Sequence, residues 1–245
     1  MSELIKNVTD NAVFVLEFLL IIVGLFLAAL LVEKVADSKN AVKGRLFTTR
    51  KVAMIGMFSA ISMILMLFEL PLPFAPPFYK LDLSELPVLI GGFAFGPAAA
   101  VMIEFAKILL KLFVKGTSTA FVGELANFSV GCSFVLPASI VYLFWKKKKG
   151  AITGCVIGTL VLTIFGSLFN AVYLLPAFSK LYGMPLDTIL GMGSAVNPLM
   201  TEGSMVSFVV CCVVPINLIK GSVVSVLTML IYKPLSPIIK SSLQK

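Results

Sequence analysis

Apolar stretches long enough to cross a lipid bilayer follow one another along this chain, separated by short polar or proline-rich segments. The residues are 59% hydrophobic and 13% charged, and the mean hydropathy is +1.04, far above that of a soluble domain. A bilayer core requires about 20 apolar residues per helix. The 245 residues therefore provide about six or seven membrane-spanning helices with short loops and leave no room for a soluble catalytic domain.

Basic residues indicate on which side of the membrane each apolar stretch ends. The first stretch, residues 11–32, is followed by a segment rich in Lys and Arg, and a run of lysines, Lys146 to Lys149, follows a later stretch. Short loops enriched in Lys and Arg stay in the cytoplasm. The net charge of +8 therefore reports topology and does not indicate a nucleic-acid partner.

These features predict an all-α integral membrane protein in four sections. Residues 1–32 form an extra N-terminal membrane helix, which we expect to be retained because no small-residue cleavage site follows it. Residues 33–51 form a basic cytoplasmic linker, residues 52–233 a six-helix membrane domain, and residues 234–245 a cytoplasmic tail.

Prolines and glycines divide the six-helix domain. A proline cluster after residue 70 ends one helix and places residues 74–82 in an external loop. Residues 176–202 form a second, longer external loop. The last apolar stretch, residues 204–232, is about 43 Å long as a helix, so we expect its spanning part to begin at Pro215. The expected helices are 52–70, 83–95, 98–114 after the turn at Gly96-Pro97, 122–145, 151–175 and 215–232.

Several functions are excluded by residues and motifs that the sequence lacks. It has no histidine, which removes the commonest general base and the commonest metal ligand. It has no G-x-x-x-x-G-K-[ST] phosphate loop, so any step driven by ATP needs a partner protein. The four cysteines lie in apolar stretches without C-x-x-C spacing and are interpreted as packing residues. The sequence therefore favours binding or transport within the membrane over an enzyme, and it indicates no metal or cofactor.

Polar side chains inside the apolar stretches lie on four of the expected helices. They form three pairs spaced by one helical turn and a single amide: Asn217 with Lys220, Glu104 with Lys107, Glu124 with Asn127, and Asn170. Ionisable side chains at bilayer depth are costly and often mark a ligand or ion pathway. Because the predicted topology places them all toward the outer ends of their helices, we expect one polar site that is open to the outside. Two alternatives remain open, namely that Lys220 extends to the lipid headgroups and that Glu104 and Lys107 form a simple ion pair.

The residue types of this site indicate the kind of ligand. Asparagine offers a donor and an acceptor on one planar group and lysine offers donors, which suits the mixed edge of a heterocycle. In the first external loop, Phe74, Phe78 and Tyr79 are able to stack on a flat ring. No arginine follows Arg50, which disfavours a phosphorylated ligand.

A face of small residues lies on the helix that follows the basic linker. Ala53, Gly56 and Ala60 line this face, which we call the small-residue face. Small residues let another helix approach closely. The face predicts either a partner protein or internal packing within the bundle.

The sequence resembles the riboflavin-specific substrate-binding (S) component of energy-coupling factor (ECF) transporters from about Arg50 to Tyr232. The resemblance rests on six segments in collinear order: Pro71 to Pro77, Leu81 to Pro87, Phe93 to Pro97, Gly123 to Phe128, Asn170 to Pro176, and Pro215 to Gly221. Together the motifs are specific, although each is weak alone.

The resemblance implies a six-helix membrane protein that captures riboflavin from outside and carries no other cofactor. It would dock through the small-residue face on a transmembrane coupling protein that bears two cytoplasmic ATPases. By this resemblance Asn170, Asn217 and Lys220 hold the flavin ring, and the loop from Phe74 to Asp82 closes over it. The full set of expected ligand-binding residues is Asn170, Asn217, Lys220, Glu124, Asn127, Lys107, Phe78, Tyr79, Leu81 and Asp82.

Other functions are compatible with the sequence. One is an S component for another vitamin. A second is a stand-alone ion-coupled carrier that uses Glu104, Lys107 and Glu124 as a charge relay. A membrane-embedded enzyme is the weakest, because Lys220 and Ser222 are two residues apart and diverge on a helix.

Overall fold

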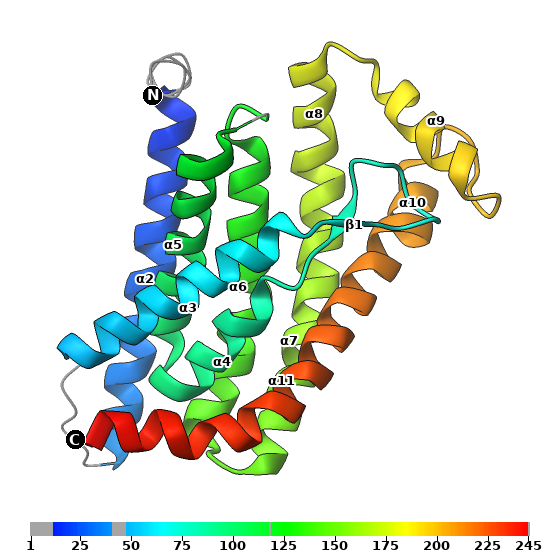
Figure 1. Ribbon diagram of the computed structural model, residues 1–245. Helices are drawn as coiled ribbons and strands as arrows, with labels where there is room; N and C mark the ends of the chain where they lie inside the picture. The colour runs from blue at the N-terminus through cyan, green and yellow to red at the C-terminus, as the bar shows by residue number, and fades with distance from the viewer. Residues whose placement is uncertain (1–11, 41–47, 118, 245) are drawn as a thin grey trace.

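The structure is a computed structural model that describes residues 12–40, 48–117 and 119–244, and it is almost entirely helical (Figure 1). The start of the predicted N-terminal section and residues 41–47 of the predicted linker lie outside the described residues. The elements are α2 (Ala12–Asn40), α3 (Thr49–Leu67), β1 (Leu70–Pro71), β2 (Lys80–Leu81), α4 (Glu85–Phe95), α5 (Pro97–Lys115), α6 (Val122–Phe144), α7 (Lys148–Phe169), the π-helical turn η1 (Asn170–Leu174), α8 (Leu175–Tyr182), α9 (Leu186–Val196), α10 (Met205–Phe208), the π-helical turn η2 (Val209–Val213) and α11 (Val214–Gln244).

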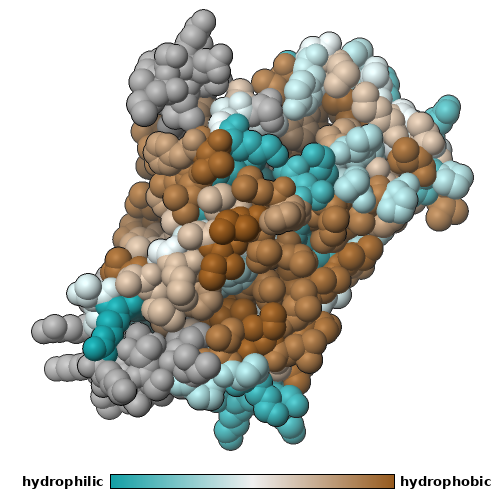
Figure 2. Space-filling model, viewed as in Figure 1, coloured by the Kyte–Doolittle hydropathy of each residue, from teal (hydrophilic) through white to brown (hydrophobic). Residues whose placement is uncertain are grey.

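Five helical stretches of the described chain are long and apolar enough to cross a membrane. They are Phe18–Ala36, Thr49–Leu67, Val122–Phe144, Lys148–Tyr182 and Met205–Leu235. Figure 2 shows apolar side chains over most of one face of the bundle, with hydrophilic ones gathered above and below. The hairpin of α4 and α5 completes the bundle, although α4 with 11 residues rises only about 16 Å. The turn at Gly96-Pro97 is confirmed, because Gly96 has φ of 101° and Pro97 begins α5.

The antiparallel pair α6 and α7 crosses closely because glycines of α7 face α6. A Cβ atom on Gly154 would lie 2.6 Å from the carbonyl oxygen of Ala138, and one on Gly158 would lie 2.7 Å from that of Phe134. Only glycine permits such an approach of two helix backbones.

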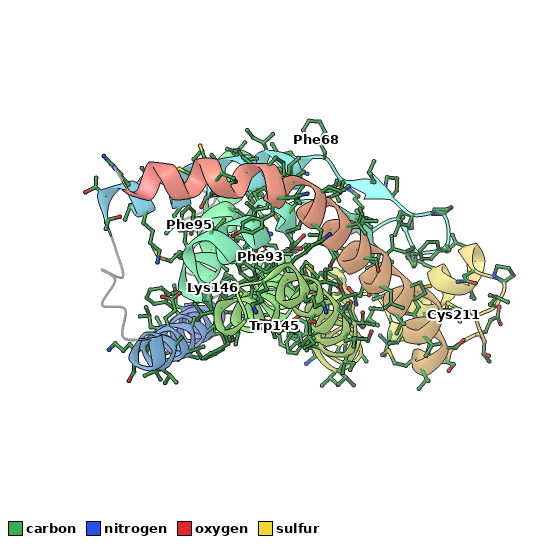
Figure 3. All side chains as sticks on the ribbon, turned by 90° about the horizontal axis from the view of Figure 1, so that it is seen from below. Phe68, Phe93, Phe95, Trp145, Lys146 and Cys211 are labelled. Atoms are coloured by element: carbon green, nitrogen blue, oxygen red, sulfur yellow. The ribbon has the colours of Figure 1, made fainter. Side chains whose placement is uncertain are left out.

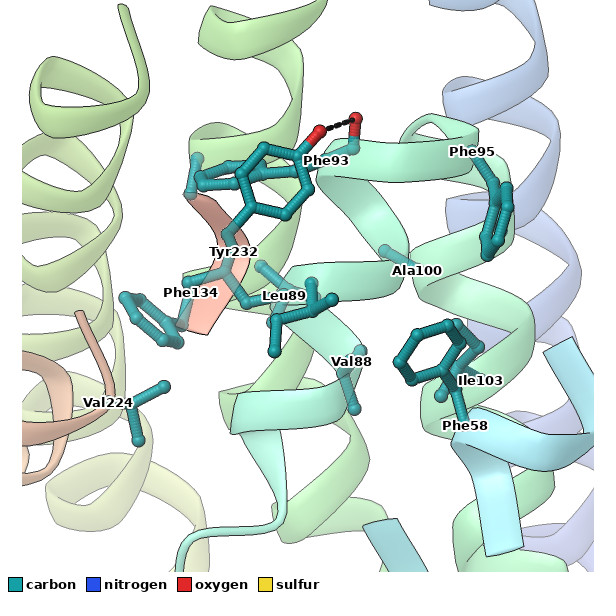
Figure 4. Close-up of a cluster of buried hydrophobic side chains, with 14 of the residues drawn as sticks. Phe58, Val88, Leu89, Phe93, Phe95, Ala100, Ile103, Phe134, Val224 and Tyr232 are labelled. Atoms are coloured by element: carbon teal, nitrogen blue, oxygen red, sulfur yellow. Dashed lines mark hydrogen bonds between the residues drawn. The ribbon is translucent and has the colours of Figure 1, made fainter. Parts of the chain in front are cut away.

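A cluster of aromatic side chains fills the bundle toward the end that carries Lys146 to Lys149. We call Phe93, Phe134, Tyr142 and Tyr232 the aromatic cluster. Figure 4 shows Phe93, Phe134 and Tyr232 of this cluster. The rings of Phe93 and Tyr142 are 4.7 Å apart, and the hydroxyl of Tyr232 donates to the carbonyl oxygen of Phe93 at 3.3 Å. Seen from below, Phe93 lies near the centre of the bundle, whereas Phe68 and Cys211 lie toward its edge (Figure 3).

Helix α2 packs against α5 and α6. The ring of Phe18 meets that of Phe128 on α6 at 5.7 Å. At the other end of α2 the buried carboxylate of Glu33 accepts a hydrogen bond of 2.9 Å from the backbone N–H of Ala98 in the first turn of α5. Four N–H groups at a helix start lack partners within the helix, and an anion there is favoured.

The predicted polar linker is helical over its first eight residues, because α2 continues from Glu33 to Asn40. No glycine or proline interrupts this part of the sequence, and the contact between Glu33 and α5 fixes it on the bundle. Helix α3 then begins at Thr49. The hydroxyl of Thr48, the residue before it, caps the helix by accepting a hydrogen bond from the N–H of Lys51.

The prediction of a long external loop at residues 176–202 is wrong. Helix α7 continues through η1 and α8 to Tyr182, and α9 follows after a short connection. The prediction that the last helix begins at Pro215 is also wrong. The helix begins at Met205 with α10 and continues through η2 into α11.

A π-helical turn lies just before a proline in both cases, and this explains both errors. Pro176 follows η1 and Pro215 follows η2, each by two residues. A proline has no N–H and clashes with the carbonyl group four residues earlier, and a wider turn accommodates this clash. Before Pro215, the carbonyl oxygen of Cys211 accepts a hydrogen bond of 3.1 Å from the side-chain amide of Asn197.

Candidate functional site

The first external loop closes on itself as a small hairpin beside the bundle. Strand β1 pairs antiparallel with β2, with Leu70 opposite Leu81. The ring of Phe78 is 40% exposed and lies 4.8 Å from that of Tyr79 and 6.4 Å from that of Phe178 on α8. Leu81 is buried. The hairpin thus holds an aromatic pair against α8, η1 and α10.

Tyr79 joins this hairpin to Asn170. Its hydroxyl donates a hydrogen bond of 2.6 Å to Oδ1 of Asn170, and Nδ2 of Asn170 donates to the carbonyl oxygen of Gly166 at 2.7 Å. Burial raises the pKa of Tyr79 well above its usual value, so the phenol stays protonated. Asn170 is the first residue of η1, and π-helical turns are frequent at functional sites.

Asn217 of α11 approaches the same stretch of α7. A Cβ atom on Gly166 would lie 2.8 Å from Nδ2 of Asn217, so the glycine makes room for the amide. Asn217 is 6% exposed, and its Nδ2 has no hydrogen-bond partner among the described residues. The buried hydroxyl of Ser167 on α7 has none either. We call Tyr79, Ser167, Asn170 and Asn217 the amide site. Both predicted ligand-binding amides lie against Gly166, and Nδ2 of Asn217 is one of two unsatisfied polar atoms of the site.

Lys220 lies one turn after Asn217 and is turned inward. Its ammonium group is 3.2 Å from Oδ2 of Asp82 and 2.9 Å from Oε2 of Glu85. The alternative in which Lys220 extends to the headgroups is therefore wrong. Burial alone would raise the pKa of Asp82, but Lys220, Lys107 and hydrogen bonds from Ser84 lower it to about 2.

The pairing predicted for Glu104 and Lys107 is confirmed, and it extends further. The ammonium group of Lys107 is 2.7 Å from Oε1 of Glu104, 3.2 Å from Oε1 of Glu85 and 2.8 Å from Oγ of Ser84. Glu85 therefore bridges the two buried lysines. We call Asp82, Ser84, Glu85, Glu104, Lys107 and Lys220 the charge network.

Glu124 belongs to a different group. It lies 3.4 Å from the ammonium group of Lys111 and accepts hydrogen bonds from the hydroxyls of Thr117 and Thr119 at 3.0 and 3.1 Å. Asn127 is half-buried and forms no side-chain hydrogen bond with another described residue. The structure thus divides the predicted polar residues between the amide site, the charge network and this third group, and it does not join Glu124 to Glu104 and Lys107.

The sequence reasoning missed Ser84, Glu85 and Ser167 as site residues. One signal for Glu85 was present, because it follows Asp82 by three residues at a predicted helix start. Ser167 carries no such signal, since a serine one turn from an asparagine is common in apolar helices.

The small-residue face of α3 points away from the bundle. Ala53 and Gly56 are exposed, and a Cβ atom on Gly56 would meet no described atom within 4 Å. Ala60 is half-buried. The alternative that Gly56 serves internal packing is wrong for the described part of the chain.

The region that contains the amide site, the charge network and α3 matches a known family. Residues 50–232 match the family model of the ECF transporter, substrate-specific component. The riboflavin transporter RibU of Staphylococcus aureus (strain TCH60) is 37% identical over 192 residues, which cover 78% of this chain and 93% of the relative. The riboflavin transporter FmnP of Bacillus subtilis (strain 168) is 30% identical over 189 residues, which cover 77% and 93%.

A solved structure agrees with these relatives. The structure described as "Structure and mechanism of the S component of a bacterial ECF transporter" has 34% sequence identity and a TM-score of 0.61, and the match covers 78% of this chain and 97% of that one. Helix α2 lies before the family match and outside its residues. The resemblance inferred from the sequence motifs is confirmed: the chain belongs to the family of substrate-specific S components of ECF transporters, which are transport proteins and not enzymes.

Proposed function

We propose that this chain binds riboflavin and serves as the riboflavin-specific subunit of an ECF transporter for vitamin uptake across the cell membrane. The names of the relatives support this ligand. The observation that carries the proposal is the buried amide of Asn217, whose Nδ2 has no partner among the described residues and lies against Gly166, to which Asn170 also bonds. A buried donor without a partner costs about 1–3 kcal/mol, and a ligand carbonyl group would remove that cost.

The ligand contacts are divided between the helices and the hairpin loop. Asn170, Asn217 and Lys220 face the polar edge of the flavin ring. The other expected residues either cover the ring or fix the positions of residues around it. Phe78, Tyr79, Leu81 and Asp82 form the cover over the ring. Lys107 fixes Glu85, and Glu124 and Asn127 line the outer approach.

The loop from Phe74 to Asp82 acts as the lid. The hydroxyl of Tyr79 donates to Oδ1 of Asn170, and the carboxylate of Asp82 pairs with the ammonium group of Lys220. Both bonds join the lid to residues that we expect to contact the flavin. Riboflavin therefore competes with the lid for Asn170 and Lys220, and lid opening precedes binding.

The proposal is tested by titrating the purified protein with riboflavin and following the quenching of flavin fluorescence. We expect saturable binding, and we expect Asn170→Ala and Asn217→Ala each to weaken it by roughly 5- to 150-fold. Thr228→Val is the matched control, because this buried hydroxyl on α11 also lacks a partner but lies about three turns from Asn217. A folded sample that does not quench flavin fluorescence contradicts the proposal. Displacement of riboflavin by another vitamin would show that the chain binds that vitamin instead.

Energy for uptake comes from partner proteins, namely a transmembrane coupling protein and two cytoplasmic ATPases. The exposed small-residue face of α3 is the docking surface. Gly56→Trp is expected to abolish co-purification with the coupling protein and to leave riboflavin binding unchanged. Ile164→Trp, at an exposed position of α7, is the control and keeps co-purification.

The proposed topology places Lys146 to Lys149 and the tail, residues 234–245, in the cytoplasm and the amide site on the outer side. Six membrane helices make up residues 52–233, and the N-terminal section, residues 1–32, adds a further helix that continues as α2 to Asn40. A cysteine introduced at Lys147 should react with an impermeant thiol reagent only after the cytoplasmic side is opened. Reaction in intact cells would show that the topology is the opposite of the one proposed.

A further inference from the structure

The charge network holds unequal numbers of acidic and basic side chains. It contains three carboxyl groups, on Asp82, Glu85 and Glu104, and two ammonium groups, on Lys107 and Lys220. Asp82 is 7% exposed, Glu85 3%, and Glu104 and Lys107 0%. With every group ionised, the network would bury one uncompensated negative charge in a membrane protein. Such a charge is so costly that a buried group usually takes up or loses a proton instead.

The three carboxyl groups differ in how well they are compensated. Asp82 accepts from the backbone N–H of Ser84 at 2.8 Å and faces Lys220. Glu85 lies between both lysines, with one oxygen toward each. Glu104 faces Lys107 through Oε1 only, and its Oε2 is buried without a partner among the described residues. If all three carboxyl groups were ionised, the negative charge of Glu104 would therefore be the least balanced by neighbouring positive charges and hydrogen-bond donors.

Among the described residues, the positive charges that face Glu104 are those of Lys107 and Lys220. A Cβ atom on Gly131 would lie 2.2 Å from Oε1 and 3.3 Å from Oε2, so the carboxyl group rests directly on the backbone of α6. The titratable groups that face it are Lys107 on its own helix, Glu85 on α4, Lys220 on α11 and the Cys132 thiol on α6. Both lysines are already engaged by Glu85.

We infer that Glu104 is a proton-binding site and carries its proton in the ligand-free protein at neutral pH. The proton resides on one carboxyl oxygen of Glu104. The network then contains two carboxylates and two ammonium groups and is neutral. The site depends only on the chain's own side chains and is independent of which ligand the amide site takes.

Infrared spectroscopy of the ligand-free protein tests this site. We expect the carbonyl stretching band of a protonated carboxylic acid at neutral pH, and we expect this band to shift when glutamate alone is labelled with ¹³C at its carboxyl group. Glu104→Gln, which replaces the acid by an amide of similar shape, should fold and lack the band. Glu124→Gln should keep the band, because Glu124 is buried beside Lys111 and two threonine hydroxyls.

Two results would overturn the inference. One is a wild-type protein without a glutamic acid band at neutral pH, a result that needs no variant to fold. The other is a band that persists in folded Glu104→Gln. Neither result bears on riboflavin binding, which is measured separately by fluorescence.

Discussion

The charge network and the aromatic cluster are built partly on the same two helices, yet they stabilise the bundle in different ways. On α4, Glu85 and Phe93 are eight residues apart, and on α11, Lys220 and Tyr232 are twelve apart, or about 12 and 18 Å along each helix. The aromatic cluster depends on shape, because its rings pack against one another and the Tyr232 hydroxyl adds only neutral hydrogen bonds, to the carbonyl oxygen of Phe93 and to the hydroxyl of Tyr142. The charge network depends on charge balance, because each lysine contacts two carboxyl groups. Losing a charged partner should therefore cost more than losing a neutral hydrogen bond.

The largest effect is expected for Lys107→Met. This change removes the ammonium group from Glu104, Glu85 and Ser84 while it keeps the volume of the side chain. Breaking a buried ion pair by removing one partner costs about 3–5 kcal/mol of unfolding free energy. Denaturant unfolding in detergent measures this loss. The control is Lys115→Met, whose side chain is 53% exposed and 3.8 Å from Glu69, and which should cost about 1 kcal/mol or less.

A smaller, pH-dependent effect is expected for Asp82→Asn. The pKa of Asp82 is about 2 in the folded protein, against an ordinary value of 3.8. Because the pKa of Asp82 is lower in the folded than in the unfolded protein, its carboxylate stabilises the folded protein at pH values above the unfolded-state pKa. This contribution of about 2 kcal/mol is lost as the pH falls from about 4 to 2. The variant should lack this part of the acid dependence in unfolding experiments. Equal acid dependence in the two proteins would show that Asp82 is not paired, and Glu202→Gln, at an exposed residue, provides the baseline.

The smallest effect on stability is expected for Tyr232→Phe. It removes the hydroxyl group that donates to Phe93 and leaves the ring contacts of the aromatic cluster in place. A neutral hydrogen bond contributes about 0.5–1.5 kcal/mol. A loss as large as that of Lys107→Met, measured in the same unfolding assay, would remove the distinction between the two regions.

The sequence predicted those features that depend on local spacing. The hairpin at Gly96-Pro97 follows from turn chemistry, and the pairing of Glu104 with Lys107 follows from a separation of one helical turn. The close-packing face around Gly56 follows from small residues four apart, but whether it faces a partner or the bundle was left open. Each of these can be read along one helix or one turn.

The features that were missed depend on residues far apart in the chain. Glu33 ends an apolar stretch and looks like the start of a polar linker, but its carboxylate binds the start of α5, 65 residues later. Pro176 indicated the end of one helix and Pro215 the start of another, because the π-helical turns that accommodate these prolines leave no pattern in the sequence. The role of Glu85 becomes visible only when α5 and α11 bring two lysines to it.

We propose that the unsatisfied amide of Asn217 and the nearby Asn170 form one wall of a riboflavin site. Riboflavin titration of the wild type, Asn217→Ala and Thr228→Val in parallel decides whether they do. We expect tight, saturable quenching for the wild type and Thr228→Val, and affinity reduced roughly 5- to 150-fold for Asn217→Ala. Equal affinity of all three folded proteins would show that Asn217 does not contact riboflavin.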